Sequence, residues 1–161
     1  MMKLIVISGS PGTGKSTLAQ ALVKTFGFKR LDLHDHYKTI STGYDRTKQA
    51  YNIDLKKFAA LVKKELRSND RTLVIDSHVT HLLPKTLVDL CIILTCSNLK
   101  KLEKRLQERK YSKRKIRENL DAEIFQICLT EAQERGHQIL LLDSSKLSKK
   151  DLVAQVMVKV S

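Results

Sequence analysis

The sequence contains no tryptophan, and aromatic residues make up only 5% of it. Proteins that bind single-stranded RNA through stacked bases need aromatic platforms, so this class of RNA-binding protein is poorly supported. Proline occurs only twice, and no proline- or serine-rich linker and no internal repeat divides the 161 residues. A chain of this length can form one domain around a sizeable core, so we expect a single domain over residues 1–161.

The sequence also has few cysteines and no long apolar run. Cys91, Cys96 and Cys128 lack a Cys-x-x-Cys spacing, so we expect buried free thiols rather than a metal site or a disulfide. No apolar run approaches the roughly 18 residues that span a bilayer. The apolar start, Met1 to Ser8, has no small-residue cleavage site and predicts a buried first strand rather than a signal peptide. We therefore expect a soluble protein of the cytoplasm, or of the nucleus in a eukaryote, with no membrane partner.

Acidic residues are outnumbered by basic ones. The sequence has 30 lysines and arginines against 17 aspartates and glutamates, a formal net charge of +13. The excess is concentrated between residues 100 and 117, where ten basic and two acidic residues give a charge of +8. This balance favours nucleotide substrates or polyanionic partners and carries no information about the fold.

Apolar runs alternate with amphipathic stretches along the whole sequence, a pattern typical of a mostly parallel sheet flanked by helices. We expect strands at residues 3–8, 28–33, 71–76, 88–95 and 138–143. We expect helices at residues 15–26, 34–40, 54–67, 98–110, 112–135 and 148–160, with Asp54 and Asn98 as N-caps and Gly136 as a stop. Five strands with helical crossovers predict a doubly wound α/β domain that binds its ligand at the carboxyl ends of the strands.

The most informative motif is the P-loop, which runs from Gly9 to Ser16 as Gly-Ser-Pro-Gly-Thr-Gly-Lys-Ser. It lies directly after an apolar strand pattern and directly before a helix, which is the context that this motif requires. Its backbone N–H groups turn inward around phosphates, and the helix N-terminus adds positive potential. We expect Lys15 to bridge the β- and γ-phosphates, Ser16 to contact Mg²⁺ and Thr17 to contact the α-phosphate. The ATP-binding residues predicted in this segment are Gly12, Gly14, Lys15, Ser16 and Thr17.

Several classes of P-loop protein are excluded. The sequence contains neither the Asn-Lys-x-Asp guanine reader nor the Asp-x-x-Gly switch of GTPases. Motor and transporter ATPases are usually much longer. The small kinases remain, in which a basic lid closes on the triphosphate and a second flap binds the acceptor.

Short motifs between the P-loop and Arg135 point to one group of small kinases. They are Gly43-Tyr44-Asp45, Val74-Ile75-Asp76-Ser77-His78, Pro84, the segment 103–111, Asn119 and Glu123-Ile124-Phe125-Gln126. Together they resemble the adenylate kinase isoenzyme 6 family, and the block from Arg105 to Gln126 is the most specific part. The resemblance implies an adenylate kinase-like P-loop fold, ATP and AMP as substrates and ADP as product. It also implies ATPase activity and a role in maturation of the small ribosomal subunit, with a platform protein of that subunit as partner.

The candidate catalytic residues are Lys15 in the P-loop, Arg109 in the expected lid, and Asp76 and His78. Asp76 ends a predicted strand, where an aspartate can hold a Mg²⁺-bound water, so we expect Ser16 and Asp76 to hold the metal, partly through water. His78 lies two residues further on and shares the face of Asp76 if the strand continues. The resemblance implies that His78 orients or activates the attacking water. We interpret His81 as structural, and no spacing supports a zinc site among His34, His36, His78 and His81.

The lid is expected over residues 108–118. Arg105 and Arg109 are four residues apart and share one helix face. In an adenylate kinase-like lid the first packs on the adenine and the second reaches the transferring phosphates, for which the planar guanidinium is suited. We interpret Lys100, Lys101 and Lys104 as a solvated face. Lys113, Arg114 and Lys115 either line the lid or face RNA, and the sequence does not separate these alternatives.

The acceptor flap is expected over residues 32–54. The residues expected to bind AMP are Asp35 and Lys38. Asp35 matches the family's aspartate, but Lys38 stands where the resemblance expects an arginine for the nucleotide phosphate, so bidentate phosphate binding is lost there. Arg46 or Lys48 could compensate. The leading hypothesis is a Mg²⁺- and ATP-dependent AMP kinase with ATPase activity, a monomer. The alternative is a nucleotide-switched assembly factor, in contact with a ribosomal protein or rRNA, whose ATPase activity dominates. A kinase for another small acceptor is a third hypothesis.

Overall fold

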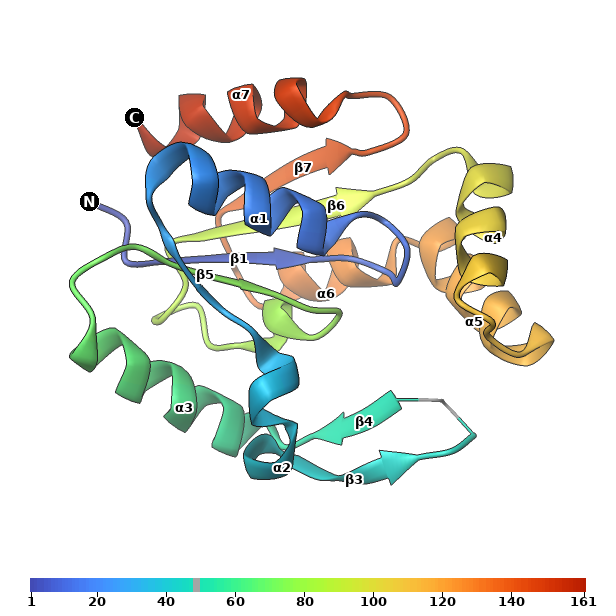
Figure 1. Cartoon of the computed structure of the whole chain (residues 1–161), viewed down its shortest axis with the longest axis horizontal. Helices are drawn as coiled ribbons and strands as arrows, with labels where there is room; N and C mark the ends of the chain where they lie inside the picture. The colour runs from blue at the N-terminus through green and yellow to red at the C-terminus, as the bar shows by residue number, and fades with distance from the viewer. Residues whose placement is uncertain (48–49) are drawn as a thin grey trace.

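A computed structural model describes residues 1–47 and 50–161. Its centre is a five-stranded parallel sheet in the order β2-β5-β1-β6-β7. The strands are β1 (Leu4–Ser8), β2 (Lys29–Leu31), β5 (Leu73–Asp76), β6 (Leu90–Thr95) and β7 (Ile139–Asp143). All run in one direction, so their carboxyl ends share one edge of the sheet (Figure 1). The predicted α/β class with a five-stranded parallel sheet is confirmed.

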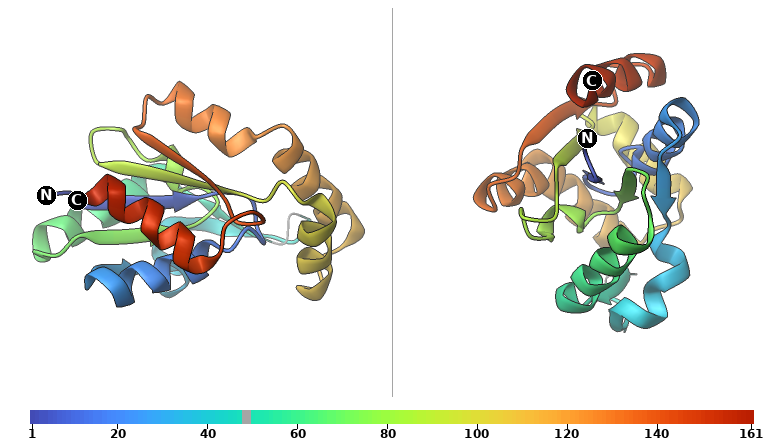
Figure 2. Two further views of the ribbon diagram at one scale, coloured as in Figure 1. Left: turned by 90° about the horizontal axis from the view of Figure 1, so that it is seen from above. Right: turned by 90° about the vertical axis from the view of Figure 1, so that its left-hand side faces the viewer.

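Helices cover both faces of the sheet. The period of two along β1 sends Leu4 and Val6 to one face and Ile5 and Ile7 to the other. The first pair packs in a core with α3 (Leu55–Ser68) and α6 (Ile127–Glu134). The second pair packs with α1 (Lys15–Phe26) and α7 (Lys149–Val160). Figure 2 shows α1 and α7 on the opposite side of the sheet from α6.

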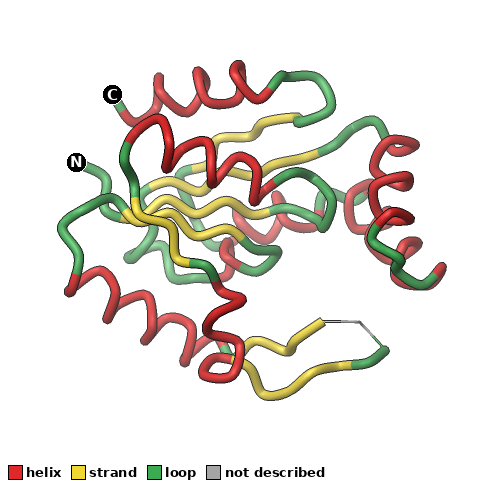
Figure 3. Tube along the Cα trace, viewed as in Figure 1, coloured by secondary structure: helices red, strands yellow, loops and turns green. Residues whose placement is uncertain are grey.

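Two smaller units stand at the carboxyl ends of the strands. The first is the helix pair α4 (Leu99–Glu108) and α5 (Lys113–Ile124), which has a small core of its own around Leu102 and Leu106. The second follows β2 and consists of the 3₁₀ turn η1 (Leu33–His36), the short helix α2 (Tyr37–Ile40) and an antiparallel hairpin of β3 (Ser41–Asp45) and β4 (Ala50–Ile53). Figure 3 shows this hairpin as strand outside the main sheet. The sequence pattern predicts no strand there.

The predicted helix over residues 112–135 is wrong as one continuous element. α5 ends at Ile124 and α6 begins at Ile127. The break lies at Gln126, which adopts the left-handed conformation with φ 52° and ψ 49°. A residue in that conformation cannot continue a right-handed helix. The other predicted helix ends agree better: Asp54 and Asn98 cap α3 and α4 through their side chains, and Gly136 follows α6 at φ 76°.

The cysteines are free thiols, two of them buried (Cys91 and Cys96) and one, Cys128, half-buried. Within residues 1–47 and 50–161, no group of three or more His, Cys, Asp or Glu side chains is placed to hold a metal ion. No helix in the same described part of the chain is both long enough and apolar enough to cross a membrane.

Candidate active site

The P-loop connects the carboxyl end of β1 to the first turn of α1. Two of its glycines are required by the geometry. A Cβ on Gly9 would lie 2.3 Å from the carbonyl oxygen of Leu94, and Gly14 has φ 97°, a conformation that side chains disfavour. The Lys15 ammonium donates to the carbonyl oxygens of Gly9 (2.9 Å) and Ser10 (3.0 Å). Burial, together with the neighbouring Arg109 charge, lowers the pKa of Lys15 to about 8. A bound phosphate would offer this lysine a stronger partner than the loop carbonyls do.

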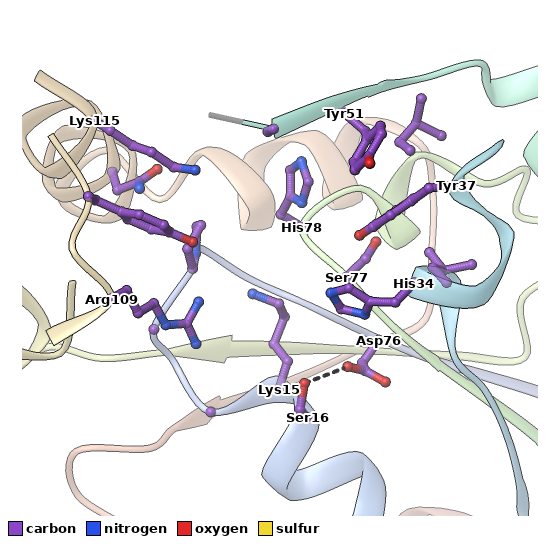
Figure 4. Close-up of a pocket in the computed structure, with 18 of the residues that line it drawn as sticks. Lys15, Ser16, His34, Tyr37, Tyr51, Asp76, Ser77, His78, Arg109 and Lys115 are labelled. Carbon is purple, nitrogen blue, oxygen red and sulfur yellow. Dashed lines mark hydrogen bonds between the residues drawn. The ribbon is translucent and has the colours of Figure 1, made fainter. Parts of the chain in front are cut away.

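Asp76 lies where β5 ends, directly beside the P-loop, because β5 neighbours β1 in the sheet. The Ser16 hydroxyl donates to Asp76 Oδ2 over 3.1 Å (Figure 4). A hydroxyl and a carboxylate in contact at a phosphate-binding loop form a set of oxygen donors that suits Mg²⁺. The structure thus brings the two residues predicted for the metal into contact, although the metal site itself stays a prediction.

Arg30 is a residue that the sequence analysis missed. From β2 it makes a bidentate pair with Asp76: Nε donates to Oδ1 over 2.8 Å and Nη2 to Oδ2 over 3.1 Å. The side chains are 19% and 5% exposed. The Asp76 hydrogen bond raises the pKa of Arg30, so the guanidinium keeps its charge. The sequence signal for Arg30 was a single arginine within a short strand pattern. Its pairing with Asp76 could not be inferred without the strand order.

His78 lies in a bend rather than on a strand. β5 ends at Asp76 itself, so the strand does not continue to His78 and the condition for a shared face with Asp76 is not met. It nevertheless lines the same cavity as Lys15 and Asp76. His78 is exposed to solvent at the cavity, yet desolvation by the protein atoms packed around its ring lowers its pKa to about 4, and the nearby charges of Lys15 and Lys115 act in the same direction. The ring is therefore neutral at pH 7 and can accept a hydrogen bond from water.

His81 has the structural place that we interpreted for it. Its side chain is 1% exposed, and its ring nitrogens contact Ser8 Oγ at 2.5 Å and Glu131 Oε1 at 3.0 Å. The arrangement resembles a hydrolytic triad in composition, but Ser8 is 0% exposed and out of reach of a substrate. We interpret it as a brace that ties α6 to the strand before the P-loop.

The helix pair α4 and α5 supplies the lid residues. Arg105 donates to the carbonyl oxygen of Gly12 over 3.0 Å. Lys115 is 7% exposed, and its ammonium lies 3.8 Å from the centre of the Tyr111 ring. It lines the cavity of Lys15, whereas Lys113 and Arg114 are exposed and do not. The sequence could not assign these three basic residues to the lid or to an RNA-facing surface, and in the structure Lys115 alone among the three lines the cavity.

Two cavities of about 530 and 520 Å³ meet at the P-loop. They share the walls formed by Gly12, Gly14, Thr17 and Arg109. The first cavity extends over Asp76 and His78 to the flap. The second extends over Arg105 to the segment 144–152. Two ligands bound on the two sides would therefore bring their ends together at Gly14 and Arg109, next to Lys15 on the side of the first cavity.

The flap side of the first cavity differs from the prediction. Asp35 and Lys38 are exposed and do not line it, and neither does Arg46. Lys48 lies outside the described residues. The flap residues that line the wall are Leu33, His34, Tyr37, Tyr44, Ala50, Tyr51 and Ile53. Burial raises the pKa of Tyr37, so its hydroxyl is protonated at neutral pH.

Comparison with known proteins places this site in a family. A family model described as an AAA domain matches residues 5–126. The adenylate kinase isoenzyme 6 homolog of Schizosaccharomyces pombe is 37% identical over 132 residues, which cover 81% of this chain and 74% of that protein. The corresponding homolog of Caenorhabditis elegans is 35% identical over 132 residues, again 81% of this chain and 72% of that protein. The chain belongs to the adenylate kinase isoenzyme 6 homolog family.

Membership of this family makes the chain an adenylate kinase-like phosphotransferase, and the predicted resemblance is confirmed. The solved structures agree on the fold. The YorR protein of Bacillus subtilis, in complex with phosphorylated GDP, superimposes with a TM-score of 0.66 at 17% identity over 98% of this chain and 95% of that one. A deoxyadenosine kinase from M. mycoides with bound dATP superimposes with a TM-score of 0.58 at 18% identity over 99% of both chains. At such identities the likeness concerns the fold alone.

Proposed function

We propose that the protein is a nucleoside monophosphate kinase that transfers the γ-phosphoryl group of Mg-ATP to AMP, with slow ATP hydrolysis as a second activity. The observation that carries the proposal is the pair of cavities that meet at Gly12, Gly14, Thr17 and Arg109. A protein that only hydrolyses ATP needs one nucleotide site and a water, whereas a kinase needs room for a donor and an acceptor. In this scheme ATP occupies the cavity beside Arg105, and the acceptor occupies the cavity beside the flap.

Catalysis in this scheme is positioning and charge neutralisation. Lys15 leaves the carbonyl oxygens of Gly9 and Ser10 to bind the β- and γ-phosphates. Arg109 and Lys115, which approach from the lid, neutralise charge on the transferring group. Ser16 and Asp76 would hold Mg²⁺, which when bound neutralises phosphate charge, and Arg30 keeps the Asp76 carboxylate oriented.

His78 is proposed to act in hydrolysis when no acceptor is bound. Its neutral ring lines the cavity beside Lys15 and can accept a hydrogen bond from the attacking water. Bound AMP would displace that water, so we expect hydrolysis to fall as AMP saturates the enzyme.

The test measures ADP and phosphate separately from ATP and Mg²⁺, with and without AMP. The kinase proposal expects AMP to increase ADP formation severalfold and to be converted to ADP itself, which labelled AMP would report. Phosphate release that AMP does not change, with no label in ADP, would reject the kinase and leave an ATPase.

A second candidate function is a nucleotide-switched factor in assembly of the small ribosomal subunit. It is favoured by the exposed basic surface of α4 and α5, which includes Lys100, Lys101, Lys104, Lys113, Arg114 and Arg117. In this scheme ATP binding changes the affinity for a platform protein or for rRNA, and hydrolysis resets it. Binding through this surface should weaken steeply as salt rises.

The corresponding experiment reverses charge at Lys113 and Arg114, which do not line the cavity, and measures binding to rRNA and to the platform protein over a salt series. Charge reversal at Lys63 and Lys64, exposed on α3, is the matched control. We expect the first pair of substitutions to weaken binding and to reduce its salt dependence. Equal effects of the two pairs would reject a specific role for this surface.

A further inference from the structure

The position of the His78 ring depends on the backbone that carries it. The ring is exposed at the cavity (Figure 4), and within residues 1–47 and 50–161 it forms no hydrogen bond that would hold it in place. His78 lies in the bend after β5 that leads into the 3₁₀ turn η2 (Thr80–Leu82). Whatever holds the segment 77–82 therefore also places the His78 side chain.

Two hydrogen bonds hold the segment 77–82 against the end of β1. The backbone N–H of Ser77 donates to the carbonyl oxygen of Ile7 over 3.1 Å, and the Thr80 hydroxyl donates to the same oxygen over 2.9 Å. Both Ser77 and Thr80 are buried. Because the two bonds converge on one acceptor atom, they fix the distance of the segment from β1 better than its rotation about that atom.

His81 supplies contacts in three further directions. Its Nδ1 contacts Ser8 Oγ at 2.5 Å, its Nε2 contacts Glu131 Oε1 at 3.0 Å, and its carbonyl oxygen accepts a hydrogen bond from His137 Nε2 over 2.7 Å. A carboxylate only accepts, so Nε2 carries the proton and Nδ1 accepts from the Ser8 hydroxyl. Burial lowers the pKa of His81, against the effect of Glu131, so the ring is neutral at pH 7.

This network runs from the half-exposed Glu131 side chain on α6 to the fully buried Ser8 on β1. Apolar side chains could fill the same space, but apolar contacts have no preferred direction. A buried network in which each member is paired specifies one arrangement, because every bond has a required geometry. The bonds of His81 can thus fix the rotation that the two bonds to Ile7 leave open.

We propose that His81, held by Glu131 and Ser8, is a positioning residue that keeps His78 where it can accept a hydrogen bond from the water that attacks ATP. His81 is not among the described residues that line the two cavities at the P-loop, so it acts through His78 rather than on a ligand. The network should then support hydrolysis and not transfer to AMP, in which no water attacks. This proposal rests on the proposed role of His78 in hydrolysis.

The experiment removes the partner at the half-exposed end of the network. Phosphate release from Mg-ATP and ADP formation from labelled AMP are measured in separate assays for Glu131→Ala. We expect the kcat of hydrolysis to fall about tenfold, with the KM for ATP and the rate of transfer to AMP changed less than about twofold. Glu131→Gln keeps an acceptor oxygen and should recover most of the lost hydrolysis. Glu134→Ala, which removes an exposed carboxylate from the same helix, is the matched control and should change neither rate.

Two further measurements separate positioning from a general loss of structure. In the His78→Asn background, Glu131→Ala should lower hydrolysis no further, because the residue that the network positions is absent. Nuclear magnetic resonance of ¹⁵N-labelled histidine should show the Nε2-protonated tautomer of His81 at pH 7. An Nδ1-protonated ring, or an equal fall in hydrolysis in both backgrounds, would contradict the proposal.

The remaining outcomes also decide between the proposals. A parallel fall of hydrolysis and transfer in Glu131→Ala would mean that the network only supports the fold around the P-loop. Hydrolysis that falls in His78→Asn but not in Glu131→Ala would reject the positioning role and keep the hydrolytic role of His78, whereas hydrolysis unchanged in His78→Asn would reject both. If the wild type converts no AMP, the kinase is rejected, and a tenfold lower kcat of hydrolysis at unchanged KM for ATP in Glu131→Ala would still support the positioning role.

Discussion

Replacement of Arg30 by methionine tests the ion pair that holds the Asp76 carboxylate beside the P-loop. Asp76 accepts hydrogen bonds from Arg30 Nε, Arg30 Nη2 and the Ser16 hydroxyl, and of these three the bond from Ser16 would remain. A hydrogen bond to a charged group contributes about 1.5–3 kcal/mol, and loss of one partner of a fully buried ion pair costs about 3–5 kcal/mol. Because Arg30 is 19% exposed, water can replace part of what is lost. We therefore expect the free energy of unfolding to fall by about 2 kcal/mol.

The assay is urea unfolding at pH 7, which follows the midpoint and slope of the transition. A loss of this size should also lower the Tm by about 4–8 °C for a chain of this length. Arg71→Met, which removes an exposed arginine, is the matched control and should change stability by less than about 0.5 kcal/mol.

A double-mutant cycle with Asp76→Asn separates the ion pair from unrelated effects of each substitution. If the pair is coupled as its geometry indicates, the double variant should lose about 1–2 kcal/mol less than the sum of the single losses. Additive losses, or an Arg30→Met variant as stable as the Arg71→Met control, would refute the reasoning.

Four further predictions concern catalysis and the pH dependence of stability. Lys15→Ala should lower ATP turnover by about a hundredfold or more, since a phosphate ligand is lost; a steady-state rate near that of the wild type would mean that the P-loop is not the site. His78→Asn should reduce ATP hydrolysis more than ATP affinity, and an equal loss of both would indicate a structural histidine. Because folding lowers the pKa of His78 from 6.5 to about 4, the unfolded chain binds the proton first, and wild-type stability should fall as the pH drops from 6.5 to 4. His78→Asn should flatten that decline in urea midpoints measured across this range. Arg109→Ala should lower turnover with an unchanged Tm, whereas Lys104→Ala, on the exposed face of α4, should leave both unchanged.

Short-range sequence patterns were enough to predict most of the part of the site that is proposed to bind ATP. The P-loop, its flanking strand and helix, and the sheet class follow from short-range signals. Even the contact of Ser16 with Asp76, which are 60 residues apart, was predictable because the carboxyl ends of parallel strands share one edge. The pairing of Arg30 with Asp76 was not predictable, because it depends on β2 lying next to β5. No local segment of the sequence encodes this strand order.

The break between α5 and α6 and the hairpin β3–β4 were missed for opposite reasons. Residues 112–135 continue a helical pattern through Gln126, and nothing local distinguishes the single residue that turns left-handed. The hairpin has almost no pattern, because its strands are largely exposed on both faces and lack the alternation that marks a half-buried strand. The local sequence therefore does not predict that the tyrosines of this hairpin line a cavity.

The prediction of which flap residues line the cavity was wrong because the sequence does not determine the rotation of a short helical segment about its axis. Asp35 and Lys38 are three residues apart and share one face of the short helical segment, as do His34 and Tyr37 one position earlier. A step of one residue rotates a side chain by about 100–120° around the axis, so only one of the two pairs can line the cavity. Spacing alone cannot choose between them, whereas the packing of Tyr37 against Tyr51 does. Backbone geometry determines the P-loop, which a motif can therefore predict, whereas side-chain packing determines which flap residues line the cavity, and no local segment of the sequence encodes that packing.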